Sequence, residues 1–191
     1  MVSSTKNGIE DSFSGGDEIM GIESFFITIL PENTNFCFSN NIRSVQGNNN
    51  SFELNWEEIL KENKLSIIKK EEYIIIDNCI EMDLRNGTES TYIVLRGCFS
   101  CFDESVKKMG YIIECISNLD TVKIKIDILG EIFYFDKSRF NNIIYNAYNK
   151  KYKAFKHNYG DVILSVSPSG FFKEYRKYKS PIRRFIKKIF Q

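Results

Sequence analysis

The sequence predicts an α+β domain built on a sheet that is mostly antiparallel. Two stretches each read as a β-hairpin, and a helical pattern follows each hairpin directly. Consecutive hairpins place neighbouring strands antiparallel, and the helices that follow them can cover one face of the sheet. The 191 residues, 42% of them hydrophobic and 14% aromatic, are enough for one domain with an aromatic-rich core.

The first hairpin–helix unit is the most regular part of the chain. Residues 73–84 form a β-rich run, Asn86 and Gly87 signal a turn, and residues 91–99 form the returning strand. A helix is predicted from about residue 102 to residue 119. Its apolar positions recur every three or four residues and make one stripe: Phe102, Val106, Met109, Ile113 and Ile116.

The second unit repeats that order of elements. From Val122 to Ile128 apolar and polar residues alternate, Gly130 marks a turn, and residues 132–135 form a short strand. A second helix is predicted over residues 138–155, and Gly160 ends it. The residues expected to face inward are Phe140, Ile144, Ala147 and Tyr148.

Further elements are predicted on both sides of the two units. Before them come a strand over 22–30, a long Asn-rich loop over 31–51 and a short helix over 55–63. After them come a strand over 161–166 and a turn over 167–170. Residues 1–19 are polar and predict a disordered tail, and residues 20–191 predict a single α+β domain.

The C-terminal segment, residues 171–191, is basic and amphipathic. Ser180 suits a helix N-cap and Pro181 the first helical position. The next residues form an apolar stripe of Ile182, Phe185, Ile186 and Ile189, with Arg183, Arg184, Lys187 and Lys188 on the other face. We expect this helix to pack on its own domain with the basic face outward.

Net charge is +1, but it is distributed unevenly along the chain. Residues 1–100 carry 8 basic and 16 acidic side chains, whereas residues 101–191 carry 18 basic and 9 acidic ones. Segments of opposite charge can bind different partners or each other. No signal peptide or membrane span is predicted, so we expect a cytoplasmic protein whose five cysteines are reduced.

Cys98 and Cys101 form a Cys-x-x-Cys motif between a predicted strand and a predicted helix. A helix N-terminus lowers the pKa of a thiol, and thioredoxin-like redox proteins place this motif in such a setting. Those proteins also need a βαβ crossover, whereas hairpins flank the motif here. We therefore interpret both residues as structural thiols and keep redox activity as the alternative.

Three carboxylates, Asp77, Glu81 and Asp83, lie at even spacing within one predicted strand and would share one face. Such a cluster can be a solvated face, a partner-binding patch, or a metal or catalytic site. We expect a solvated face, with Lys123 and Lys125 as possible ion-pair partners, that contributes to binding a basic partner.

Other residue patterns argue against several kinds of chemistry. Zinc sites usually combine two close pairs of ligands, and no second pair accompanies Cys98 and Cys101. Nucleophilic triads would have to use His157, the one histidine, which lies near a predicted helix end. No glycine-rich phosphate loop is present. We expect no metal and no cofactor.

These observations favour a non-enzymatic protein-interaction module. A toxin-neutralising, immunity-type protein of a bacterial conflict system fits the size and charge, since an acidic half could cover the basic groove of a toxin. The alternative is a nucleic-acid or membrane-surface binder that acts through the basic C-terminal segment. A thiol enzyme is the third hypothesis.

Overall fold

The structure is a computed structural model that describes residues 21–31, 37–38, 53–54, 60–86, 91–118, 121–126 and 128–180. The predicted tail over 1–19 lies outside these residues, as does most of the predicted loop over 31–51. Of the helix predicted over 55–63, residues 60–63 are described, and residues 60–62 are helical.

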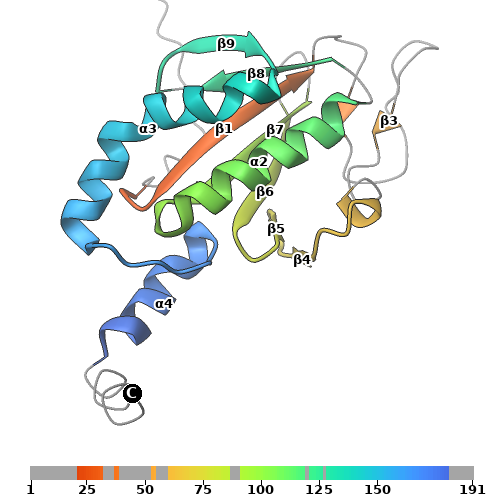
Figure 1. The fold of residues 1–191 in the computed structure, drawn as a ribbon. Coiled ribbons are helices and arrows are strands. Elements are labelled where there is room, and N and C mark those ends of the chain that lie inside the picture. The colour runs from red at the N-terminus through yellow and green to blue at the C-terminus, as the bar shows by residue number, and fades with distance from the viewer. Residues whose placement is uncertain are drawn as a thin grey trace, which may run out of the picture.

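A seven-stranded antiparallel sheet forms one layer of the molecule (Figure 1). Its strands lie in the order β4-β5-β6-β7-β1-β8-β9, and every neighbouring pair is antiparallel. The strands are β1 (Ser24–Pro31), β4 (Ile67–Lys69), β5 (Ile74–Ile76), β6 (Ile80–Asn86), β7 (Thr91–Cys98), β8 (Val122–Ile126) and β9 (Glu131–Tyr134). A separate parallel pair joins β2 (Cys37–Phe38) and β3 (Glu53–Leu54). The predicted α+β class is confirmed.

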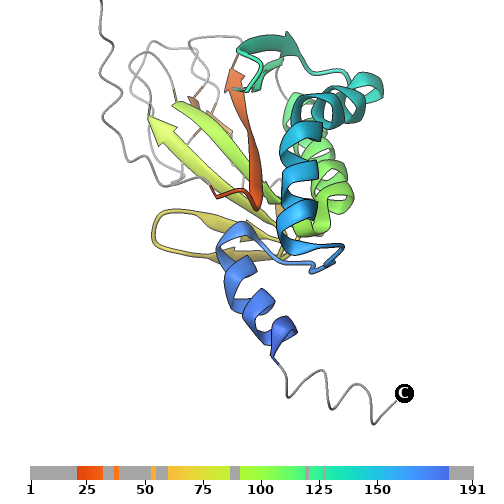
Figure 2. The ribbon, with the colours of Figure 1, turned by 90° about the vertical axis from the view of Figure 1, so that its left-hand side faces the viewer.

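Two helices cover one face of this sheet (Figure 2). Helix α2 (Phe102–Ser117) follows the β6–β7 hairpin, and helix α3 (Lys137–Tyr159) follows the β8–β9 hairpin. A short 3₁₀ turn, η1 (Phe99–Cys101), joins β7 to α2. The predicted sequence of two hairpin–helix units is therefore confirmed.

The core lies between the sheet and these two helices. All five residues of the predicted apolar stripe on α2 are buried, as are Phe140, Ile144 and Tyr148 of α3. The Phe25 ring of β1 lies 4.8 Å from that of Phe102 and 5.2 Å from that of Phe99, measured between centroids. The predicted aromatic core is present.

Gly97 allows α2 to approach the sheet closely. It lies opposite Phe25 on β1 and Ile80 on β6. A Cβ atom at Gly97 would be 2.8 Å from the Phe25 ring and 2.9 Å from Cβ of Ser105 on α2. No side chain fits there, and the sheet face that carries Ile80 and Gly97 is the face covered by α2.

The predicted single strand over 73–84 is wrong, because the chain reverses at Asp77 and Asn78. Both residues have positive φ, 48° and 56°. The Cys79 N–H closes the turn on the carbonyl of Ile76 at 3.0 Å. Asp and Asn tolerate this backbone conformation better than most residues, and residues 77–79 connect Ile76 to its partner Ile80. Strands β5 and β6 are therefore a hairpin of their own.

The prediction after α3 is also wrong in two places. Residues 161–166 do not form a strand, and the Leu164 N–H bonds the carbonyl of Ser100 at 3.3 Å. The predicted turn over 167–170 is the beginning of helix α4 (Pro168–Lys179), for which Ser167 is the N-cap residue. Ser180 is the C-cap of α4, and the amphipathic helix predicted beyond it lies outside the described residues.

Candidate functional site

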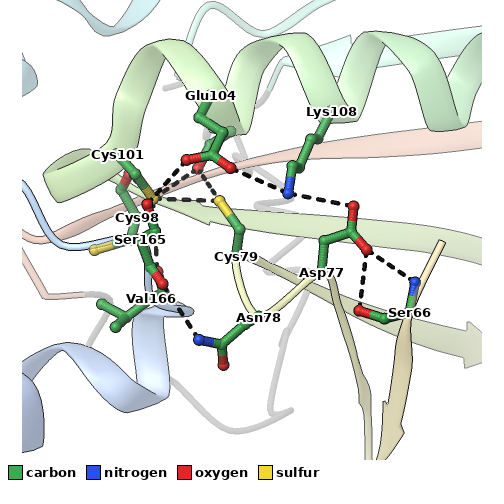
Figure 3. A network of polar contacts seen from close by, with 11 residues as sticks. Ser66, Asp77, Asn78, Cys79, Cys98, Cys101, Glu104, Lys108, Ser165 and Val166 are labelled. Atoms are coloured by element: carbon green, nitrogen blue, oxygen red, sulfur yellow. Dashed lines mark hydrogen bonds and ion pairs between the residues drawn. The ribbon is translucent and has the colours of Figure 1, made fainter.

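The Asp77–Cys79 turn, the beginning of α2 and the segment 162–167 meet in one network of polar contacts (Figure 3). Each partner comes from a different part of the chain, and the hairpin turn brings them together. Positive φ at Asp77 and Asn78 lets three successive side chains reach different partners. We refer to this network as the turn–helix junction.

The Asp77 carboxylate is held by Ser66 through one oxygen and by Lys108 through the other. Its Oδ1 accepts hydrogen bonds from the backbone N–H and the hydroxyl of Ser66, at 2.8 and 3.0 Å. Its Oδ2 lies 3.2 Å from Nζ of Lys108, which also pairs with Glu104 at 3.1 Å. Partial burial acts to raise the pKa of Asp77, but the Ser66 hydrogen bonds and the Lys108 charge outweigh it, so this pKa lies below 3.8.

Segment 162–167 is tied to the same junction. The Asn78 side-chain amide donates to the carbonyl of Ser165 at 3.3 Å, and the Ser165 hydroxyl donates to Glu104 at 3.0 Å. The Ser100 hydroxyl donates to the carbonyl of Leu164 at 2.8 Å. Side chains from η1, α2 and the turn therefore fix the chain that leads into α4.

Two thiols and a hydroxyl lie at the centre of the junction. The sulfurs of Cys79 and Cys101 are 3.2 Å apart, and the Ser105 hydroxyl lies 3.1 Å from Cys79 and 3.4 Å from Cys101. The Cys101 sulfur also lies 3.6 Å from the carbonyl of Val166. When the Cys79 thiol donates to the Cys101 sulfur, the hydrogen bond between them lowers the pKa of Cys101 to about 7 and raises the pKa of Cys79.

The Cys-x-x-Cys motif has the local setting that the sequence predicts, but its two sulfurs have different surroundings. Cys98 ends β7 and Cys101 is the N-cap of α2. The Cys98 sulfur bonds the Ser100 hydroxyl at 3.1 Å, and burial raises the pKa of Cys98 to about 12. The Cys101 sulfur instead contacts Cys79, a residue that no motif in the sequence connects with it.

The three predicted acidic residues do not form a single solvated face. Asp77 lies in the turn, where the even spacing of a strand does not apply. Glu81 is 3% exposed, pairs with Arg96 and accepts the backbone N–H of Ser169 at 2.7 Å. Asp83 is half-buried on the same face of β6 as Glu81, away from α2. Glu81 thus joins two strands to the N-terminus of α4.

The predicted basic residues Arg183, Arg184, Lys187 and Lys188 lie outside the described residues. The neighbouring helix α4 is itself basic. Its exposed side chains include Lys173, Arg176, Lys177 and Lys179. His157 is exposed in the last turn of α3, as predicted.

An exposed apolar surface on the β8–β9 hairpin is a feature that sequence reasoning missed. The exposed residues are Ile128, Leu129, Ile132 and Tyr134. The alternation of apolar and polar residues in 122–128 predicts two faces of a strand. It does not predict that β9 is the last strand of the sheet. We refer to these four residues as the β9 edge surface.

In comparisons with known proteins, no family model, curated protein or solved structure matches the chain. Among the described residues, no group of three or more His, Cys, Asp or Glu side chains could hold a metal ion. None of the helices in that part of the chain is both long and apolar enough to cross a membrane.

Proposed function

We propose that the chain is a non-enzymatic intracellular protein-interaction module that binds an extended segment of a partner protein along β9. The observation that carries this proposal is the position of the β9 edge surface. Four of the nine exposed large hydrophobic residues in the described part of the chain lie between residues 128 and 134. An exposed apolar cluster of this kind marks an interaction site.

The backbone of β9 supports the choice of an extended partner. β9 is the last strand of the sheet and pairs only with β8 among the described strands. An outer edge exposes N–H and C=O groups to which a further strand can bond. Ile132 and Tyr134 are each 55% exposed and lie on one face of β9, where they can contact alternate side chains of the added strand.

The opposite edge of the sheet differs in its charges. β4 also exposes an isoleucine, Ile68, at 46%. It is three residues long, and the exposed charged residues that follow Ile68 are Lys69, Lys70, Glu71 and Glu72. Short length and charge are the usual means by which proteins prevent pairing at a sheet edge. β9 is four residues long and has one charged residue, Glu131, and the next charged residues, Asp136 and Lys137, come only after Phe135. We therefore assign β9 to the partner.

The experiment compares one substitution at each edge in quantitative co-purification. Ile132→Lys should lower recovery of a stoichiometric protein partner at least 10-fold, because a charge on β9 opposes strand addition. Ile68→Lys is the matched control and should leave recovery unchanged. Equal recovery with wild type and both variants would contradict binding at β9. Self-association of the purified chain that Ile132→Lys abolishes would make a second copy the occupant.

The toxin-neutralising class is the finer part of the proposal. The acidic first hundred residues support it, since a basic toxin would be attracted to them. Asp77 and Glu81 already pair with Lys108 and Arg96, which reduces what they offer a partner. Asp83 is the third predicted contact, and Asp83→Lys should slow association with a basic partner and flatten its salt dependence.

A second candidate function rests on α4. Its beginning is anchored through buried Phe171 and the Glu81 contact, whereas the rest of the helix extends beyond the body of the molecule (Figure 1). Exposed Phe172 and Tyr178 accompany its basic side chains. Rings interleaved with cations suit single-stranded nucleic acid or an anionic membrane surface.

Anisotropy titrations with an oligonucleotide at several salt concentrations test this candidate, and Arg176→Glu should weaken binding and reduce the salt slope.

A further inference from the structure

The thiols of Cys79 and Cys101 are close enough to form a covalent bond. Cys79 lies at the end of a hairpin turn and Cys101 is the N-cap residue of α2. The two residues are 22 positions apart in the sequence. Their sulfurs are 3.2 Å apart, and both residues are free cysteines in this structure. A disulfide has an S–S length of about 2.05 Å, so the sulfurs need to approach by about 1.2 Å.

We propose that Cys79 and Cys101 are a reversible redox pair, which a hydroperoxide oxidises to a disulfide and a cellular dithiol reduces. This site is separate from the β9 edge surface and does not depend on the proposed function.

Access and electrostatics make Cys101 the thiol that reacts first. Cys101 is 6% exposed, whereas Cys79 is 0% exposed, so Cys101 is the more accessible of the two residues to an oxidant. Cys101 lies at the N-terminus of α2, which favours a thiolate, and the Ser105 hydroxyl can donate to it from 3.4 Å. The hydrogen bond from Cys79 brings the pKa of Cys101 down to about 7, against burial and the Glu104 charge, which both act to raise it.

The reaction has two steps. The Cys101 thiolate attacks one oxygen of the hydroperoxide, the O–O bond breaks, and Cys101 becomes a sulfenic acid while the other oxygen leaves and takes up a proton. The Cys79 sulfur then attacks the Cys101 sulfur, the S–O bond breaks, and the hydroxyl leaves as water with the Cys79 proton. Two thiols and one hydroperoxide thus give one disulfide, one alcohol (or water) and one water.

Cys98 is the alternative partner that the sequence motif suggests, and the geometry disfavours it. Its sulfur is directed to Ser100, and the contact between Cys98 and Cys101 runs from the Cys101 sulfur to the Cys98 carbonyl at 3.7 Å. The redox partner of Cys101 is therefore on the neighbouring hairpin.

Peptide mapping of the full chain tests the proposal directly. The protein is treated with hydrogen peroxide, denatured with N-ethylmaleimide to block free thiols, and digested with trypsin without reduction. Cleavage at Lys and Arg places Cys79 in peptide 71–85 and both Cys98 and Cys101 in peptide 97–107. The expected product links these two peptides and is about 2 Da lighter than their sum, because two thiol hydrogens are lost.

Matched variants identify the two sulfurs. Cys98→Ser should still give the linked product, whereas Cys79→Ser should leave Cys101 as a sulfenic acid that dimedone traps. The Cys98→Ser result does not depend on the folding of the Cys79 variant. A disulfide within peptide 97–107, or full alkylation of Cys79 and Cys101 after peroxide, would overturn the proposal.

Thermal unfolding gives an independent readout. The bond would close a loop between residues 79 and 101, and oxidised wild type should melt about 5–10 °C higher than reduced protein. Dithiothreitol should reverse the shift. Persistence of the same shift in Cys79→Ser would show that another oxidation causes it.

Discussion

The two hairpin–helix units have the same order of elements but different neighbours. In the first unit, β6 and β7 lie between β5 and β1, so both strands are paired on both sides. In the second unit, β8 pairs with β1 and β9 is the outermost strand. The same sequence pattern thus produces an interior unit and an edge unit, and the two differ in where their strands lie in the sheet.

The two helices show the same difference. Nine of the 16 residues of α2 are buried, whereas four of the 23 residues of α3 are. α2 packs on β6 and β7 and also contacts α3, which lies on the same face of the sheet (Figure 2). The first unit therefore carries most of the packing that stabilises the fold, and the second leaves more surface for contact with other molecules.

The largest expected effect is on core packing in the first unit. Phe102→Ala should destabilise the protein by about 3–5 kcal/mol, because a buried ring that contacts Phe25 and Phe99 would leave a cavity. Phe133→Ala on β9 removes a ring of the same size from a half-buried position and should cost about 1–2 kcal/mol. Chemical denaturation measures both, and equal losses would contradict the distinction between the units.

The next effect compares an ion pair within the first unit with an exposed ion pair that joins the two units through α2 and α3. Glu81→Ala should lower the free energy of unfolding by about 2–3 kcal/mol, because it leaves Arg96 and the Ser169 N–H without their carboxylate. The loss is smaller than for a fully buried pair, because Arg96 is partly exposed. Lys137→Ala removes an exposed pair with Glu114 and should cost less than about 1 kcal/mol. A larger loss of stability for Lys137→Ala than for Glu81→Ala would contradict this prediction.

A smaller, pH-dependent effect is expected at Asp77. Its pKa is lower in the folded chain than in the unfolded chain, so the unfolded chain takes up the proton first as pH falls. The stabilisation is complete above a pH of about 4 and is lost as pH falls through the folded pKa. Denaturation at several pH values should show that Asp77→Asn removes this loss. Parallel pH profiles for the variant and wild type would mean that Asp77 contributes no such linkage.

The smallest effect on stability is expected at the β9 edge surface. Ile132→Lys should change the free energy of unfolding by no more than about 0.5 kcal/mol, because the side chain is exposed. Ile124 on the adjacent strand β8 is fully buried, and Ile124→Ala should cost about 2–5 kcal/mol. A loss of several kcal/mol for Ile132→Lys would show that β9 is needed for folding and is not an open surface.

Local patterns predicted most of the elements well. The apolar stripe of α2 and the alternation in 122–126 each depend on residues within a few positions of one another, and both elements are present. The turn at Asp77 and Asn78 was missed because the isoleucines around it continue a β-rich run. The Asp-Asn pair inside that run was the available signal.

The sequence by itself determined the class of fold, the two hairpin–helix units and the residues of α2 that face the core, because helix and strand periodicity are local properties. Tertiary structure decided what the functional candidates contact. Pairing of β5 with β6 and packing of α2 on β7 bring Cys79 to Cys101, and strand order leaves β9 at the edge. These outcomes depend on contacts between residues distant in sequence, which no local pattern records.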